Sequence, residues 1–378
     1  WVAYEMPTGP LSPVDASEYA TLSPTRIYDT RSTLNATALA PGEQRSITVT
    51  DIGGVPDNHV TAIVINATLI SPSASGFFTV FPSGGVRPTV YDALYATGLD
   101  KACLIVCKVG DGGKVVFYTS AGTTHMAVDV LGYFTNDYLQ VGETMTAQAP
   151  DRVYDSRDTP GTPAAAASTT TITVAGAGDA AAVFNLTTED PAAIGYFTVY
   201  PADGTLPLVS NLNYRVGDTV CNLVFCKVDS SGQVKIFTSA EAHIIVDVVG
   251  IFATDHSGPG RFVPLTPSTL YDTRQKVGTE IGESETRELE IWRLSGLLPF
   301  EFQATQVTIV AANTTEASFF TAWPGYETQP DASNLNWAAE ENESNAAVLP
   351  TGDDGLGEFI NAFGTAELAL NYRGYWTA

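Results

Sequence analysis

The sequence has little positive charge and few charged residues of any kind. It holds 18 Lys+Arg against 42 Asp+Glu, a formal net charge of −24, and charged residues make up only 16% of the chain. Nucleic acids are bound mainly through Lys and Arg that neutralise phosphates, so this balance argues against a nucleic-acid partner. It argues equally against docking on anionic lipid. The low charge predicts a surface of small polar residues, as in secreted β-proteins.

Long apolar runs and familiar catalytic motifs are also missing. The most apolar stretch, residues 243–253, is interrupted by Asp247 and is shorter than the ~18 residues that a membrane helix requires. The chain has no Gly-x-Ser-x-Gly elbow, no phosphate-binding loop and no His-Glu-x-x-His motif. We therefore expect no membrane insertion, no enzymatic activity, and neither a cofactor nor a metal.

Three copies of one unit account for most of the chain. A Tyr-Asp-Thr/Ser-Arg segment occurs at residues 28–31, 154–157 and 271–274. Each copy continues with a Gly/Ser-Phe/Tyr-Phe-Thr segment, at residues 76–79, 195–198 and 318–321. Because a copy exceeds 100 residues, it is predicted to be a domain rather than a solenoid unit. The expected organisation is an N-terminal arm over residues 1–16 and repeats over residues 17–135, 143–254 and 259–378.

Within each copy the pattern predicts a series of short β-strands. Runs of β-branched and aromatic residues alternate with polar ones, for example at residues 46–50, 77–81 and 115–119. Turn signals such as Asp111-Gly112-Gly113 separate these runs and are typical of hairpin tips. No window combines a helical period with helix caps. The sequence therefore predicts an all-β protein of three tandem β-sandwich domains, jelly-roll or Greek-key-like.

The motifs of the repeat resemble those of a known module. The Tyr-Asp-Thr-Arg segment, an Asn-x-Thr strand, the Gly-Phe-Phe-Thr-Val-Phe-Pro strand at 76–82 and the closing Val-Asp-Val-Leu-Gly-Tyr-Phe at 128–134 carry the resemblance. They are similar to a repeated β-domain of large secreted and wall-associated proteins of actinobacteria and related filamentous bacteria, and of their phage tail proteins. The resemblance implies an extracellular, non-catalytic surface role. The third copy departs from the pattern, with Thr269, Asn371 and Glu367 in place of Arg, Asp and His.

Two charged positions of the repeat change together. Arg26 occurs in the copy whose closing strand holds Asp129, and Arg152 in the copy that holds Asp247. The third copy lacks both partners. Because an unpaired charge buried in an apolar strand is costly, we predict Arg26–Asp129 and Arg152–Asp247 ion pairs. Arg31, which persists in all copies, is the alternative partner, and a catalytic role for the carboxylates is the less favoured interpretation.

The four cysteines are expected to form one disulfide in each of the first two repeats. They are Cys103, Cys107, Cys221 and Cys226. Their spacing does not match a zinc site, and a secreted protein would oxidise them. Because a pair recurs in each of two copies, disulfides are favoured over free thiols. Extended residues four apart are separated by ~13 Å, however, so each disulfide would require a bend or bulge.

Each repeat holds an Asn-x-Thr triplet in an equivalent context, at Asn66, Asn185 and Asn313, and two further Asn-x-Ser/Thr triplets begin at Asn35 and Asn342. The triplet is an acceptor sequence for N-glycosylation. An asparagine inside an apolar strand is better explained as a side chain that satisfies the backbone of a neighbouring bend, and that is the favoured prediction.

The expected function is that of a non-catalytic structural protein that is secreted, attached to a cell surface or part of a virion. The apolar N-terminal arm supplies candidates for docking into a neighbouring subunit by strand addition, namely Trp1, Val2, Tyr4 and Met6; a disordered terminus is the alternative. The expected partners are further copies in a coat or appendage, or other surface proteins. A glycan-binding adhesion module is the second hypothesis, with sugars stacked on aromatic residues such as Trp323, Trp337, Tyr95 and Tyr214. Core packing of these rings is the competing interpretation, because three of them occupy one equivalent position.

Overall fold

The computed structural model describes residues 16–32, 37–137, 142–158, 161–254, 259–275 and 280–378. Each repeat contributes eight strands, and these form two four-stranded sheets per repeat. The pairings are antiparallel throughout the described strands. No helix in this part of the chain has the length and apolarity needed to cross a membrane.

The three repeats use the same order of elements. Repeat 1 supplies β1 (Glu18–Asp29), β2 (Gln44–Thr48), β3 (Val60–Ile70), β4 (Gly76–Pro82), β5 (Ala93–Tyr95), β6 (Lys101–Lys108), β7 (Lys114–Thr119) and β8 (His125–Thr135). Repeat 2 supplies β9 (Thr144–Asp155), β10 (Ser168–Thr173), β11 (Ala181–Glu189), β12 (Gly195–Pro201), β13 (Leu212–Tyr214), β14 (Thr219–Lys227), β15 (Gln233–Thr238) and β16 (His243–Ala253). Repeat 3 supplies β17 (Phe262–Asp272), η2 (Thr273–Gln275), β18 (Thr286–Glu290), α1 (Ile291–Ser295), η3 (Pro299–Glu301), β19 (Phe302–Ala312), β20 (Ser318–Pro324), β21 (Leu335–Trp337), β22 (Glu343–Pro350), β23 (Leu356–Asn361) and β24 (Glu367–Thr377).

The sheets fall into two kinds, here named A and B with the number of the repeat. Sheet 1A has the order β1-β8-β3-β6 and sheet 1B the order β2-β7-β4-β5. Sheets 2A (β9-β16-β11-β14) and 2B (β10-β15-β12-β13) follow the same scheme, as do 3A (β17-β24-β19-β22) and 3B (β18-β23-β20-β21). Apart from the pairs β4–β5, β12–β13 and β20–β21, neighbouring strands within a sheet are not consecutive in sequence.

Within a repeat, the A and B sheets face one another across a shared core. In repeat 1 this core joins Ile63 and Ile65 of β3 to Val80 of β4 and Phe117 of β7. Strand β7 alternates buried and half-exposed residues, which is the pattern of a sheet with one covered face. Equivalent clusters fill repeats 2 and 3.

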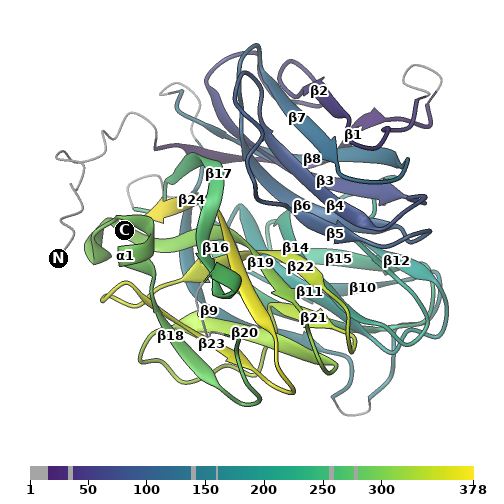
Figure 1. Ribbon diagram of the computed structural model, residues 1–378. Helices are drawn as coiled ribbons and strands as arrows, with labels where there is room; N and C mark the ends of the chain where they lie inside the picture. Colours follow the sequence, from purple (N-terminus) through teal and green to yellow (C-terminus); the bar gives the residue numbers. More distant parts are fainter. Residues whose placement is uncertain (1–15, 33–36, 138–141, 159–160, 255–258, 276–279) are drawn as a thin grey trace.

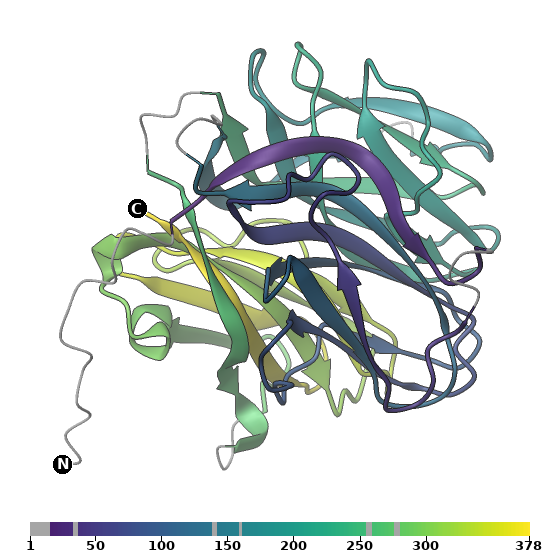
Figure 2. The same ribbon diagram turned by 90° about the horizontal axis from the view of Figure 1, so that it is seen from above.

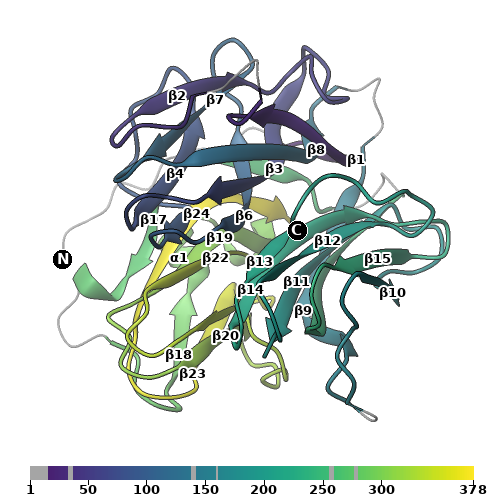
Figure 3. The same cartoon turned by 90° about the vertical axis from the view of Figure 1, so that its right-hand side faces the viewer.

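The chain is all-β, but the prediction of three tandem sandwich domains is wrong. The six sheets are arranged as the six blades of a β-propeller, in the order 1B, 1A, 2B, 2A, 3B and 3A (Figures 1 and 3). Contacts between repeats fix this order: Asn66 of 1A reaches the loop before β13, Asn185 of 2A the loop before β21, and Arg373 of 3A the strand β4. The last contact closes the ring from repeat 3 to repeat 1.

The ring forms because the A sheets are apolar on both faces. Residues Ala62 to Leu69 of β3 are all buried. One face of this strand covers the core of repeat 1 and the other faces the neighbouring repeats. A near-continuous apolar run of this kind is typical of a strand covered on both sides. An isolated sandwich domain would leave half of these side chains in water.

A central aromatic cluster joins the three repeats at the middle of the ring. Each repeat contributes one residue from its first strand and one from its last; they are Tyr19, Phe134, Met145, Phe252, Phe262 and Trp376. The ring centroids of Tyr19 and Phe252 are 4.4 Å apart, and those of Phe134 and Phe262 are 4.6 Å apart. Burying one such ring contributes about 1.5–3 kcal/mol. The view from above shows the three repeats side by side, each next to the other two (Figure 2).

Backbone hydrogen bonds connect the first strands of the repeats beside this cluster. Ser17 and Phe262 exchange two bonds, of 2.9 and 2.8 Å. Tyr19 and Glu143 exchange another two, and the Met145 N–H donates to the Gly260 carbonyl at 3.0 Å. The three repeats are therefore hydrogen-bonded to one another as well as packed together.

Candidate functional site

The structure places Arg26 beside Asp129 and Arg152 beside Asp247. Arg26 lies opposite Asp129 in the β1–β8 register, and its Nε donates to the Asp129 carboxylate. The Arg152 Nε lies 2.7 Å from Asp247 Oδ1. Burial raises the pKa of Asp129, and the hydrogen bond from the guanidinium opposes this shift. In repeat 3, Thr269 faces Asn371 at the same register position.

Arg31, the alternative partner of Asp129, is instead paired with Asp29. The Arg31 Nη2 lies 2.8 Å from Asp29 Oδ2, and the Arg31 backbone N–H donates to Asp29 Oδ1 at 2.9 Å. Hydrogen bonding to Arg31 lowers the pKa of Asp29 to about 2. The same backbone and side-chain contacts recur between Arg157 and Asp155 and between Arg274 and Asp272. The repeated Tyr-Asp-Thr-Arg segment thus builds a turn.

The hydroxyl of this segment ties it to the last strand of the repeat. Thr30 Oγ1 lies 3.0 Å from His125 Nδ1 and accepts a hydrogen bond from the Met126 N–H. Ser156 makes the equivalent contact with His243 Nδ1 at 2.9 Å. Each of these two histidines therefore has a structural partner. No group of three or more metal-ligating side chains exists among the described residues.

The predicted disulfides are wrong, because all four cysteines are free and buried. Cys103 and Cys107 lie on one straight strand, β6, and both point into the core of repeat 1. The strand register also shows that the two pairs are not equivalent. Cys107 corresponds to Cys226, whereas Cys103 corresponds to Asn222, because Cys103 pairs with Ala67 where Asn222 pairs with Leu186.

Asparagines form a network across the first two junctions between repeats. The Asn66 Nδ2 donates to the Ser210 carbonyl at 2.6 Å, and Asn222 Nδ2 donates to Asn66 Oδ1 at 3.1 Å. The Asn185 Nδ2 donates to the Ser333 carbonyl at 2.6 Å. Asn66 and Asn185 therefore satisfy the backbone of a bend, as predicted, and the bend belongs to the next repeat.

The third triplet does not share this role. Asn313 follows the end of β19 and has a positive φ of 51°. The residue of repeat 3 that faces Asn371, as Asn66 faces Asp129, is Thr308. The Asn-x-Thr triplet of repeat 3 is therefore not equivalent to those of repeats 1 and 2. The equivalent position, which the strand pairing defines, lies several residues earlier, at Thr308.

The third junction, where repeat 3 meets repeat 1, adds buried charges to an amide contact, in which Asn371 Nδ2 donates to the Tyr91 carbonyl at 2.9 Å. Arg373 of β24 pairs with Asp92, and both side chains are 2% exposed. The Arg373 Nη1 also donates to the Val80 carbonyl at 2.8 Å. Nearby, Lys101 Nζ lies 2.9 Å from Glu343 Oε1. Burial raises the pKa of Asp92 and of Glu343, and the cationic partners oppose that shift.

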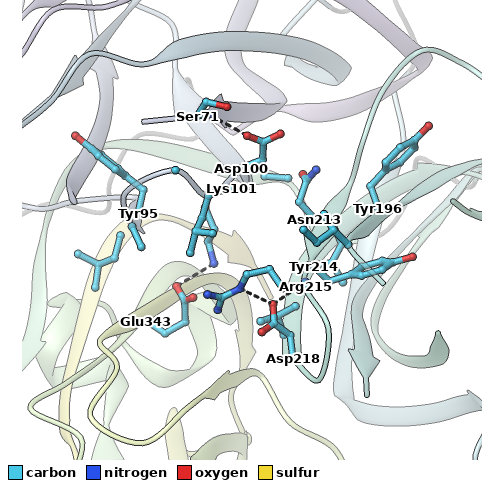
Figure 4. A pocket seen from close by; sticks show the side chains of 18 of the residues that line it. Ser71, Tyr95, Asp100, Lys101, Tyr196, Asn213, Tyr214, Arg215, Asp218 and Glu343 are labelled. Atoms are coloured by element: carbon cyan, nitrogen blue, oxygen red, sulfur yellow. Dashed lines mark hydrogen bonds and ion pairs between the residues drawn. The ribbon is translucent and has the colours of Figure 1, made fainter. Parts of the chain in front are cut away.

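A cleft of about 700 Å³ opens where the three repeats meet. Lys101 and Glu343 are joined at its base, and the Arg215 Nε lies 3.1 Å from Asp218 Oδ2 (Figure 4). Tyr196, on its wall, is 39% exposed. Four carboxylates and two cations line the cleft, so its charge is slightly acidic; the carboxylates are Asp100, Asp218, Glu341 and Glu343.

The aromatic residues proposed for sugar stacking are buried. The exposed fractions are 3% for Trp323, 4% for Trp337, 5% for Tyr95 and 3% for Tyr214. Tyr95 and Tyr214 line the cleft but expose little of their rings, and each hydroxyl has a hydrogen-bond partner. The cleft residues Tyr196 and Arg215 were not identified as site residues from the sequence. Tyr196 lies in the Gly-Tyr-Phe-Thr motif, which indicates a strand, and the meeting of the three repeats at the cleft is not visible in any one repeat. The arm candidates Trp1, Val2, Tyr4 and Met6 lie outside the described residues.

No protein-family model and no curated protein matches this chain. Two solved structures are similar to it at a distance. One is a chain from the triple jelly roll fold and turret assembly of an archaeal virus, with 9% identity, coverage of 97% of this chain and 98% of that chain, and a TM-score of 0.17. The other is a chain of Sulfolobus turreted icosahedral virus, with 10% identity, coverage of 96% of both chains and a TM-score of 0.17. Likenesses this distant carry no argument here.

Proposed function

We propose that the protein is a non-catalytic, extracellular structural protein, a self-assembling subunit of a surface coat, appendage or virion. The observation that carries the proposal is the closed ring of three repeats around one aromatic core. A closed ring is a rigid block that presents three related outer surfaces. Symmetric assemblies are built by repeating such surfaces between copies.

Three exposed apolar side chains support contacts of this kind. Val86, Leu208 and Tyr326 are 89%, 92% and 79% exposed. Each lies in the same loop of its own repeat, between the fourth and fifth strands, which are β4 and β5, β12 and β13, and β20 and β21. Large apolar residues at related surface positions are suited to burial against a neighbouring copy.

Electron microscopy and light scattering of the purified full chain test the proposal. We expect ordered polymers above a critical concentration. The triple variant Val86→Ser, Leu208→Ser, Tyr326→Ser should raise that concentration at least tenfold, and Val153→Ser, at a separate exposed site, is the matched control. A chain that stays monomeric at all concentrations would contradict the proposal.

The N-terminal arm is a second proposed contact in the same assembly. Its apolar residues Trp1, Val2, Tyr4 and Met6 suit insertion into a neighbouring subunit. A double variant Trp1→Ser, Tyr4→Ser should weaken assembly without changing thermal stability. If assembly is unchanged, the arm is not an assembly contact, and the proposed contacts through the exposed loops are unaffected by this result.

A glycan-binding role remains the second candidate, and the cleft favours it. The half-exposed Tyr196 ring and the polar groups of Asn213 and Asp218 combine a stacking surface with hydrogen-bonding groups. A glycan array followed by calorimetry tests this role. Tyr196→Ala should abolish binding, whereas Tyr326→Ala, an exposed tyrosine outside the cleft, should not. Absence of binding on the array would exclude this second candidate.

A further inference from the structure

The three junctions of the ring differ in their chemistry. At the first two, an asparagine of the A sheet donates to a backbone carbonyl of the next B sheet. The third junction, here called the seam, joins sheet 3A to sheet 1B. It shares an amide contact of this kind, from Asn371 Nδ2 to the Tyr91 carbonyl at 2.9 Å, and adds the buried ion pair Arg373–Asp92. Beside the seam, Lys101 of sheet 1A pairs with Glu343 of sheet 3A.

The charges of the seam replace neutral residues on both sides at once. Asp92 Oδ2 accepts a hydrogen bond from the Val80 N–H, as Asn211 and Asn334 do from the equivalent strands of repeats 2 and 3. Opposite it, Arg373 stands where the first two repeats have Leu131 and Val249.

Either change alone would bury an uncompensated charge, so the pair makes the seam specific. Sheet 3A fits sheet 1B, because only there does the arginine meet an aspartate. Sheet 1B would present a lone carboxylate to any other A sheet. A buried ionic pair used in this way fixes which surfaces meet.

The seam is also the junction that no chain connection spans. Repeats 1 and 2, and repeats 2 and 3, follow one another in sequence, whereas repeats 3 and 1 meet only through non-covalent contacts. Its two faces are different surfaces of one chain. A contact between different surfaces can form within one molecule or between successive molecules.

We propose that the seam is an exchangeable interface whose second partner is another copy of this chain, with sheet 3A of one copy packed on sheet 1B of the next. Exchange buries the same surfaces as ring closure and preserves the Arg373–Asp92 pair. It yields closed dimers when two copies exchange reciprocally and open chains when they do not. This inference deepens the self-assembly proposed above and uses a surface separate from the exposed loops and the arm.

Charge reversal provides the test. Asp92→Arg places two cations in the seam, and Arg373→Asp places two carboxylates there, so neither variant closes its own ring favourably. When the two variants are refolded together from urea, both seams of a mixed pair recover one arginine and one aspartate. Native mass spectrometry should then show a mixed oligomer at least tenfold above either homo-oligomer.

A matched control is the exposed pair Arg157–Glu189, whose Nη1 and Oε2 atoms are 2.6 Å apart within repeat 2. Arg157→Glu and Glu189→Arg, mixed in the same way, should stay monomeric. If the seam variants behave like this control, or neither folds in the mixture, the proposal is overturned. If polymers form to the same extent in the charge-reversed variants as in the wild type, the proposed self-assembly is supported but the seam is not its interface.

The wild-type chain gives an independent measurement. Two isotopically distinct preparations are mixed at high concentration, opened with subdenaturing urea and returned to buffer. Oligomers that contain both masses are expected, and their fraction should rise with concentration. Monomers alone at every concentration would overturn the proposal.

Discussion

The buried carboxylate of Asp129 makes repeat 1 sensitive to the loss of one guanidinium. Its side chain is fully buried beside Arg26. Arg26→Thr removes this partner and leaves an uncompensated charge, which is strongly destabilising. We expect the free energy of unfolding to fall by about 3 kcal/mol. Urea unfolding monitored by tryptophan fluorescence measures the loss.

Repeat 3 supplies the control for this prediction. Thr269 faces Asn371 there, at the register position of Arg26 and Asp129. The double variant Arg26→Thr, Asp129→Asn therefore introduces a combination that the chain already contains. It should lose clearly less stability than the single variant. Equal losses would mean that Arg26 acts through packing and not through its charge.

Glu143 is a carboxyl group whose ionisation should change near neutral pH. Burial beside the central cluster raises its pKa from 4.5 to about 7. Between these values the folded chain binds more protons than the unfolded chain, so the free energy of unfolding falls as the pH rises through this window. Glu143→Gln should be more stable than wild type by about 1–2 kcal/mol at pH 8 and equal to it at pH 4.

Thermal unfolding at a series of pH values tests the role of Glu143. The exposed Glu288→Gln on β18 is the control, and it should leave the pH dependence of stability unchanged. An unchanged profile in Glu143→Gln as well would show that this carboxyl stays in water.

The four thiols should be unreactive in the folded protein. Burial raises the pKa of Cys221 to about 11 and that of Cys107 to about 12, and only a thiolate reacts readily. Titration with a thiol reagent at pH 8 should detect almost none in native protein and all four in guanidinium without reductant. Fewer than four in guanidinium would show that a disulfide exists after all.

Residue partners could be predicted where two positions vary together among the repeats. The pairing of Arg26 with Asp129 followed from the joint loss of both groups in repeat 3. The cysteine prediction failed because the recurrence of a pair in two repeats suggested an equivalence that Cys103 and Cys221 do not have. Their strand partners, Ala67 and Thr187, are not equivalent, and that pairing is not visible in the sequence.

At the scale of elements, the asparagine network should hold neighbouring sheets together. Asn345 of β22 donates to Asn185 Oδ1 at 2.9 Å and to the Asn334 carbonyl at 2.7 Å, and accepts from the Leu223 N–H at 3.2 Å. Asn345→Ala leaves these buried groups unsatisfied. We expect a loss of about 2–3 kcal/mol, because each buried polar group without a partner costs about 1–3 kcal/mol.

Cys103→Ala is the matched control for Asn345→Ala, because Cys103 occupies the equivalent position of repeat 1. Among the described residues, the Cys103 sulfur has one hydrogen-bond partner, the Ala67 carbonyl at 3.3 Å. Chemical denaturation of both variants should separate the two effects. A loss no greater than that of Cys103→Ala would reduce the asparagine to a packing role.

The positions of the strands were easier to predict than the pairing between strands. The runs expected at residues 77–81 and 115–119 lie within β4 and β7, and the run expected at 46–50 overlaps β2, which ends at Thr48. Their alternation reflects one buried and one exposed face, which is a local property. Helix α1 was not predicted, because five residues are too few to show a period.

The whole molecule departs further from the sequence-based expectation. Triplication is visible in the motifs, but it does not determine whether repeats stand in a row or close into a ring. The relevant signal was the continuous apolar run of β3, which requires cover on both faces. The partner for the second face lies more than 100 residues away, for example Asn66 against Ser210.

Ring closure makes the repeats dependent on one another, and truncation should reveal this. A chain that ends at residue 254 lacks repeat 3 and therefore exposes one face of sheet 1B, one face of sheet 2A and part of the central cluster. Phe134 and Phe252 would lose contact with Trp376, whose ring centroid is 5.3 Å and 5.7 Å from theirs. Exposed apolar surface of this extent promotes aggregation.

We expect the truncated chain to bind a hydrophobic dye and to aggregate, while the full chain unfolds in a single cooperative transition in calorimetry. Independent tandem domains would behave differently: removal of repeat 3 would leave a soluble two-domain protein with the original stability of repeats 1 and 2.

Adding repeat 3 back as a separate polypeptide is the sharper comparison. Because its sheets 3A and 3B complete both open faces, it should restore solubility in a 1:1 complex, and a charge-reversed Arg373→Asp version should do so less well, since the cation that meets Asp92 is lost.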